Sequence, residues 1–136
     1  MDQTGTYVNI MRESLERKRK YLAEILKLTN EQSVIAAAEK FDDERFSEIV
    51  EKKDVLIDNI NEIDKGFSSV YDRVRIEIQQ EPAAYRDALL AIQDLIRTCV
   101  DFGMQIEAVE ERNRAAMEQV FSVKFQGVRQ MKQSKT

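Results

Sequence analysis

The sequence predicts an all-α protein, folded as an antiparallel up-down-up bundle of three long helices with coiled-coil-like packing. One long stretch carries apolar residues at alternating spacings of three and four, which places them on one face of a helix. Charged residues make up 34% of the 136-residue chain, which holds only 4 glycines and 1 proline, a composition typical of long helices. Two short breaks divide the chain into three runs, and we expect a single domain over residues 1–136.

The first run predicts a helix over about residues 6–39. Its apolar stripe is widened by Leu26 and Ile35, and one lysine, Lys18, lies within it. A seam lysine, such as Lys18 here or Lys53 in the second run, can run its stem over the core and place its charge in water. Both lysines therefore indicate a loosely closed bundle. The stripe consists of Val8, Met11, Leu15, Leu22, Ile25, Thr29, Gln32 and Ala36.

Residues 40–43 interrupt the pattern. Asp42 can accept hydrogen bonds from the free N–H groups of a new helix, and Phe41 and Phe46 have the spacing of a hydrophobic staple. A single helix that continues through this point is the alternative. We expect the second helix over about residues 43–79, with a length on the order of 55 Å. Its seam comprises Phe46, Ile49, Lys53, Leu56, Ile60, Ile63, Phe67, Val70 and Val74. We expect this seam to be held between the first and third helices.

Pro82 marks the second break, because proline fits the first turn of a helix and disfavours helix at the residue before it. A third helix is expected over about residues 82–125, followed by a flexible tail over residues 126–136. A short fourth helix that folds back after Gly127 is the alternative. The third seam contains Tyr85, Leu89, Ile92, Ile96, Cys99, Ile106, Val109, Met117 and Val120.

The composition argues against an enzyme. Histidine is absent and cysteine occurs once, so an ordinary zinc site or a Glu-x-x-His di-metal site cannot form within one chain. The isolated glycines make no phosphate-binding loop. Acidic clusters such as Glu107, Glu110 and Glu111 are typical of a hydrated helix surface. We therefore expect no catalytic, cofactor-binding or metal-binding residues.

Charge and hydropathy also exclude some partners. The net charge of −4 gives no general attraction to nucleic acid, and no stretch approaches the roughly 20 apolar residues of a membrane span. A lone Cys99 among apolar neighbours is expected to be buried and reduced, which favours a cytoplasmic location. The segment 41–80 holds 11 acids and 6 bases, whereas residues 119–136 hold 4 bases and no acid. The simplest explanation of both charge imbalances is that these charged residues lie on solvated surfaces.

Beyond residues 115–117 the third run outlasts the helices that pack against it, yet apolar residues continue beside basic ones. Such a segment is a candidate for helix-against-helix binding of a partner protein. The alternatives are a homodimer closed by this segment, a segment folded back on the bundle, and a frayed end. The predicted partner-binding residues are Met117, Val120, Phe121, Val123, Phe125 and Val128.

Residues 41–60, FDDERFSEIVEKKDVLIDNI, combine an acidic helix start with an apolar pair, a lysine and further leucine-like seam positions. With the preceding residues 26–32, LKLTNEQ, this pattern resembles the FlgN-type flagellar export chaperones, over about residues 25–71. The resemblance implies a cytoplasmic chaperone that keeps hook–filament junction proteins soluble before type III export. It also implies that these hook-associated clients bind the C-terminal part of the last helix. The chain departs from the family by lacking a Tyr-Gly-containing end, with Phe125, Gln126 and Gly127 there instead.

A chaperone of this kind would cover a client's terminal amphipathic helix, which aggregates until it is assembled in the filament. The alternative function is a structural or adaptor coiled-coil rod that self-associates through the same seam. Sedimentation over a concentration series separates the two: a monomer with an unprotected tail favours the chaperone, and a tight dimer that buries the tail favours the rod.

Overall fold

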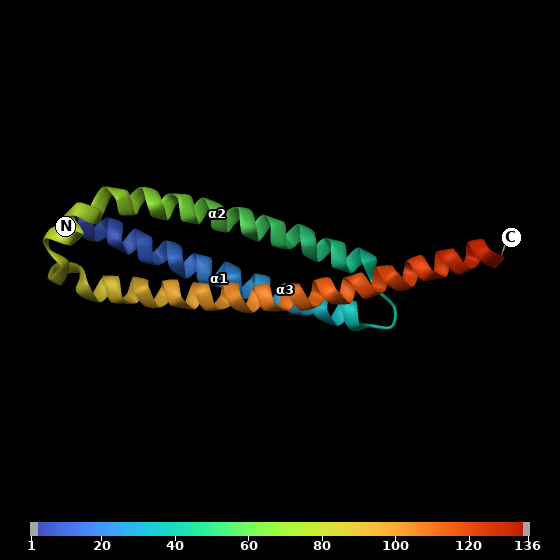
Figure 1. Ribbon diagram of the computed structural model, residues 1–136. Helices are drawn as coiled ribbons and strands as arrows, with labels where there is room; N and C mark the ends of the chain where they lie inside the picture. Colours follow the sequence, from blue (N-terminus) through green and yellow to red (C-terminus); the bar gives the residue numbers. More distant parts are fainter. Residues whose placement is uncertain (1–2, 135–136) are drawn as a thin grey trace.

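In the computed structural model, three long helices make up almost the whole chain, which confirms the all-α bundle (Figure 1). The structure describes the backbone of residues 3–134 and the side chains of residues 3–122. Helix α1 spans Gln3–Ala37, α2 spans Asp43–Gln80 and α3 spans Arg86–Ser134, with a short 3₁₀ helix, η1, at Pro82–Tyr85. The helices alternate in direction, so that α1 and α3 run one way and α2 runs the other (Figure 1).

The connection between α1 and α2 is a full break, so the alternative of one continuous helix is wrong. The Asp42 side chain accepts a hydrogen bond from the Arg45 backbone N–H at 3.0 Å and caps α2. The rings of Phe41 and Phe46 pack with their centroids 5.4 Å apart, as expected for a hydrophobic staple. Cap and staple together fix the angle at which the chain enters α2.

The connection between α2 and α3 is shorter and tighter. The Glu81 backbone N–H donates to the Glu77 carbonyl at 3.1 Å and ends α2, and the Ala84 N–H donates to the Glu81 carbonyl at 3.2 Å. The turn that follows Pro82 is therefore 3₁₀, and the α-helical part of α3 begins at Arg86 rather than near residue 82. A connection this short makes α3 run in the opposite direction to α2.

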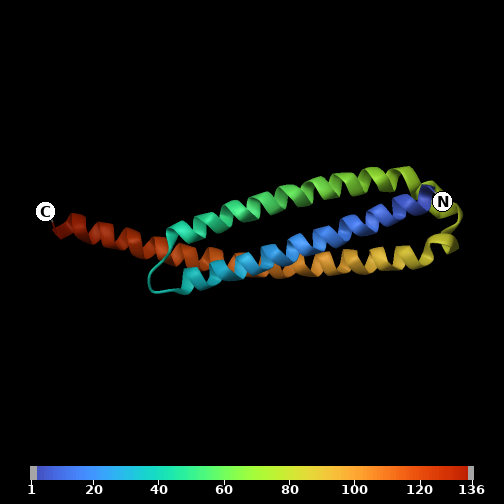
Figure 2. The same ribbon diagram turned by 180° about the vertical axis from the view of Figure 1, so that it is seen from behind.

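Helix α1 occupies the central place in the bundle. It packs along both α2 and α3, whereas the backbones of α2 and α3 approach each other at few points over the described residues. From the front and from behind, α1 runs between the other two helices for much of its length (Figures 1 and 2). The expectation that the seam of α2 lies between α1 and α3 was wrong, because the stripe of α1 is wide enough to face both neighbours. A core cluster of buried residues lies toward the N-terminal end of α1 and contains Val8, Met11, Leu15, Val74, Ile78 and Ile92.

One predicted seam position of α3 is wrong. Ile96 is 42% exposed, whereas its neighbour Leu95 packs partly buried against the core cluster. The buried positions Ile92 and Cys99 are seven residues apart, and Leu95 lies between them on the side of α3 that faces α1. Because α1 and not α2 receives the α3 seam, Ile96 is turned toward the more open side.

Helix α3 continues well beyond the end of the other two helices (Figures 1 and 2). Its backbone is helical to Ser134, so the helix end expected near residue 125 was wrong, and residues 126–134, expected as a flexible tail, lie in a helix. No proline follows Pro82, and a single glycine costs a helix only about 1 kcal/mol, so nothing local forces an earlier stop. None of the described helices has a window apolar enough to cross a bilayer.

Candidate partner-binding site

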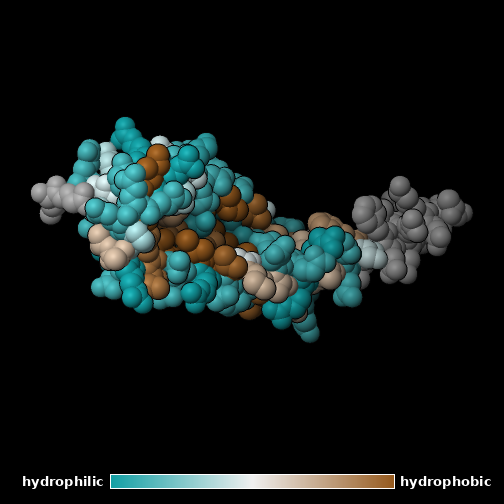
Figure 3. All heavy atoms as spheres, turned by 60° about the vertical axis from the view of Figure 1, so that its left-hand side comes forward, coloured by the Kyte–Doolittle hydropathy of each residue, from teal (hydrophilic) through white to brown (hydrophobic). Residues whose placement is uncertain are grey.

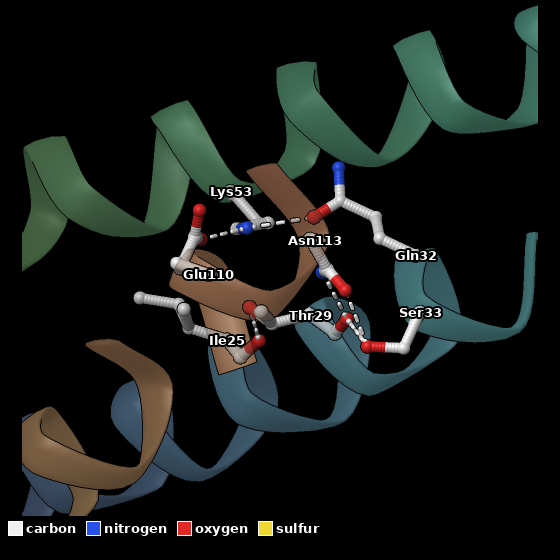
Figure 4. A network of polar contacts seen from close by, with 7 residues as sticks. All are labelled: Ile25, Thr29, Gln32, Ser33, Lys53, Glu110 and Asn113. Carbon is white, nitrogen blue, oxygen red and sulfur yellow. Dashed lines mark hydrogen bonds and ion pairs between the residues drawn. The ribbon is translucent and has the colours of Figure 1, made fainter. Parts of the chain in front are cut away.

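A buried lysine links the three helices near the level where α3 starts to leave the bundle. Lys53 of α2 is only 7% exposed, and its Nζ donates to Gln32 Oε1 of α1 at 2.8 Å. The same Nζ forms an ion pair with Glu110 of α3 (Figure 4). Lys53 was expected to carry its charge into water, and this expectation was wrong because partners on both other helices satisfy the ammonium group inside the bundle.

Asn113 extends this polar network one turn further along α3. Its Nδ2 donates to the Thr29 carbonyl at 3.0 Å, and its Oδ1 accepts from the Ser33 hydroxyl at 2.6 Å (Figure 4). Thr29 is fully buried, and its hydroxyl donates back to the Ile25 carbonyl at 2.7 Å. No buried side-chain nitrogen or oxygen of the described residues lacks a partner. The network thus fixes the register of α3 on α1 at no cost in unsatisfied groups.

An open groove runs between α2 and α3, and α1 forms its floor. It has a volume of about 590 Å³ and is lined mainly by apolar atoms. Val50 and Ile57 on its α2 wall are 42% and 43% exposed. Figure 3 shows apolar side chains exposed along the bundle between hydrophilic upper and lower surfaces. We call the pocket beside Lys53 the α2–α3 groove; its apolar lining is Phe46, Val50, Ile57 and Met117.

The rim of the α2–α3 groove is acidic. Four carboxylates line it, against two cations, Lys53 and Arg114. Each cation pairs with one of the carboxylates, on Glu110 and on Glu111 respectively. Asp54 and Glu107 form no ion pair with any other described residue and are exposed. The rim therefore favours a basic ligand.

The predicted partner-binding residues begin at the mouth of this groove. Met117 is partly buried and lines the groove. Val120 lines a second hollow of about 730 Å³, between the α1–α2 connection and α3. Phe121 is 51% exposed. The structure thus brings these three residues together on two successive turns, between the two hollows. The side chains of Val123, Phe125 and Val128 lie outside the described residues.

The described residues contain no group of three or more Cys, Asp or Glu side chains that could hold a metal ion. Cys99 is buried, with its Sγ 3.9 Å from the Leu15 carbonyl oxygen, and burial raises the pKa of its thiol. A thiol of this kind is a poor nucleophile at neutral pH because it stays protonated.

Two features of the site were not predicted from the sequence. Asn113 belongs to the α3 seam, and its spacing of four from Val109 and from Met117 was the available signal. The α2–α3 groove has no local sequence signal, because it depends on how far α2 and α3 stand apart. Comparisons with known protein families, with curated proteins and with solved structures found no match to this chain.

Proposed function

We propose that this protein is a chaperone that binds an amphipathic helix of a client protein at the end of α3, where that helix leaves the bundle. The observation that carries the proposal is the length of α3, which continues past the end of both partner helices while its sequence remains apolar (Figure 1). The resemblance of residues 25–71 to FlgN-type export chaperones supports the identity of the clients as hook-associated flagellar proteins. It also supports a cytoplasmic location before type III export.

Exposure and surroundings favour the same segment. Phe121 presents half of its surface to solvent, and Met117 and Val120 border hollows on either side of α3. An amphipathic helix laid along this segment would cover Phe121 and contact Met117 at the mouth of the first hollow. Each buried side chain contributes roughly 1.5–3 kcal/mol before ordering costs, so three or four of them are enough for micromolar affinity.

A pair of point variants tests the proposal. Phe121→Asp places a charge at the proposed contact and should weaken binding of a purified hook–filament junction protein by more than about tenfold, as measured by titration calorimetry. Val34→Asp is the matched control, because Val34 is 71% exposed on α1 and lies outside the proposed contact. Both variants should keep the helical circular dichroism of the parent, since both positions are exposed.

Deletion of residues 123–136 provides an independent test. The described core ends before Ser122, so the shortened bundle should stay helical while client binding is lost. Undiminished binding by the shortened chain would show that the segment is the wrong site. A protein that binds no client and sediments as a tight dimer would instead favour the self-associating rod.

A further inference from the structure

We propose that the α2–α3 groove receives the C-terminal segment of a second copy of this chain, so that the protein forms a reciprocal homodimer. The dimer adds the α2–α3 groove, which the client-binding proposal uses only at Met117, although both proposals involve the C-terminal segment. The groove is apolar at its centre and acidic at its rim, as required for an amphipathic helix with basic flanks. Such a helix occurs within the chain itself.

Residues 119–136 carry four basic residues and no acid. The spacing in the sequence predicts that Phe121, Phe125 and Val128 share one helix face, with Lys124 and Arg129 on either side of it. Two carboxylates that form no ion pair with another described residue, Asp54 and Glu107, line the groove from α2 and from α3 respectively. A basic helix that enters between them would meet an acid on each side.

Geometry favours a second copy over the same chain as the source of this helix. In the structure α3 is one helix to Ser134 and points away from the groove of its own chain (Figures 1 and 2). Two copies whose ends overlap in opposite directions would each lay this segment along the groove of the other. Residues 121–134 span about 20 Å as a helix, which exceeds the roughly 15 Å between Glu107 and Met117. The two contacts are equivalent, so the assembly closes as a dimer.

Charge reversal tests the contact from both sides. Asp54→Lys with Glu107→Lys makes the groove basic, and Lys124→Glu with Arg129→Glu and Lys132→Glu makes the segment acidic. Sedimentation equilibrium should show that each variant weakens dimerisation by more than about tenfold, and that added salt weakens the parent dimer. Asp58→Lys with Asp101→Lys is the matched control, since both carboxylates are exposed and neither lines the groove.

Mixing the two reversed variants separates contacts between chains from contacts within one chain. Within each variant, groove and segment carry the same sign of charge, so each alone should be monomeric. In the mixture both contacts are complementary, and a heterodimer should form. Circular dichroism of each variant shows whether it has folded, and rescue in the mixture cannot come from an unfolded chain.

Three results would overturn the proposal: a parent protein that stays monomeric at all concentrations, a dimer insensitive to both reversals, or variants that do not pair when mixed. A monomer whose C-terminal segment is protected from proteolysis would assign the groove to the same chain instead. If the client-binding proposal also holds, a client should convert the dimer to a one-to-one complex, because both ligands use the same segment. That last consequence rests on the proposed function, whereas the mixing experiment requires no client.

Discussion

At the scale of single residues, Lys53 shows how a buried charge is accommodated in this bundle. Its ammonium group is shared between a neutral amide on α1 and a carboxylate on α3. The carboxylate of Glu110 remains 47% exposed, so water still solvates part of the pair. The completely buried partner is Gln32, at 3% exposure, and its amide oxygen depends on Lys53. The energetic cost of losing the lysine therefore falls mainly on Gln32.

Lys53→Met keeps an unbranched side chain that is one atom shorter, and it removes the hydrogen-bond donor. It should lower the free energy of unfolding by about 1–3 kcal/mol, because the Gln32 oxygen is then buried without a partner. Adding Gln32→Leu should recover part of this loss, since both polar groups are then removed together. Urea denaturation of the two single variants and the double variant measures the coupling. Strictly additive costs would show that the two residues do not depend on each other.

Cys99 should make the free energy of unfolding depend on pH. Burial raises the pKa of its thiol in the folded protein, so the folded state holds its proton more tightly than the unfolded state does. The contribution of this tighter proton binding to stability is complete below the pKa of the thiol in the unfolded chain, about 8.5. It is lost as the pH rises through the pKa of the thiol in the folded protein. The difference in unfolding free energy between the parent and Cys99→Ala should therefore shrink above about pH 8.5. A constant difference from pH 7 to 10 would contradict this account.

At the scale of helices, signals from residues close in sequence predicted the structure correctly, whereas positions that depend on how the helices pack were predicted less well. Asp42, Phe41 and Phe46 predicted the break between α1 and α2 correctly, because capping and stapling depend on residues close in sequence. The seams of α1 and α2 were also predictable from spacing alone. Ile96 and Lys53 were not, because their surroundings depend on which helix is central, and that choice is made by all three helices together.

Gly66 gives a prediction for α2. It lies in the interior of the helix, and a Cβ added there would meet no atom within 4 Å. Gly66→Ala should therefore raise the free energy of unfolding by about 0.5–1 kcal/mol, since alanine loses less backbone entropy in a helix. Thermal or urea unfolding measures the change. A loss of stability would indicate that this part of α2 is not helical in solution.

At the scale of the whole molecule, the chain is a slender bundle with one helix longer than its partners. The central position of α1 leaves α2 and α3 apart, and the α2–α3 groove results from that separation. The polar network around Lys53 closes the bundle beside this groove, just before α3 continues alone. The buried core residues hold the three helices together, whereas the contacts that we propose with partners lie at the end of α3 and in the groove beside it.

Hydrogen exchange tests most directly whether the end of α3 binds the client. It is carried out at a dilution where sedimentation shows the monomer. Without partner helices, amides beyond Phe121 should exchange much faster than those of Ile92 to Asn113, which pack on α1. Adding a hook–filament junction protein should slow exchange in residues 117–134 and leave the N-terminal half of α1 unchanged. Exchange in residues 117–134 that is unaffected by the client would contradict the central claim.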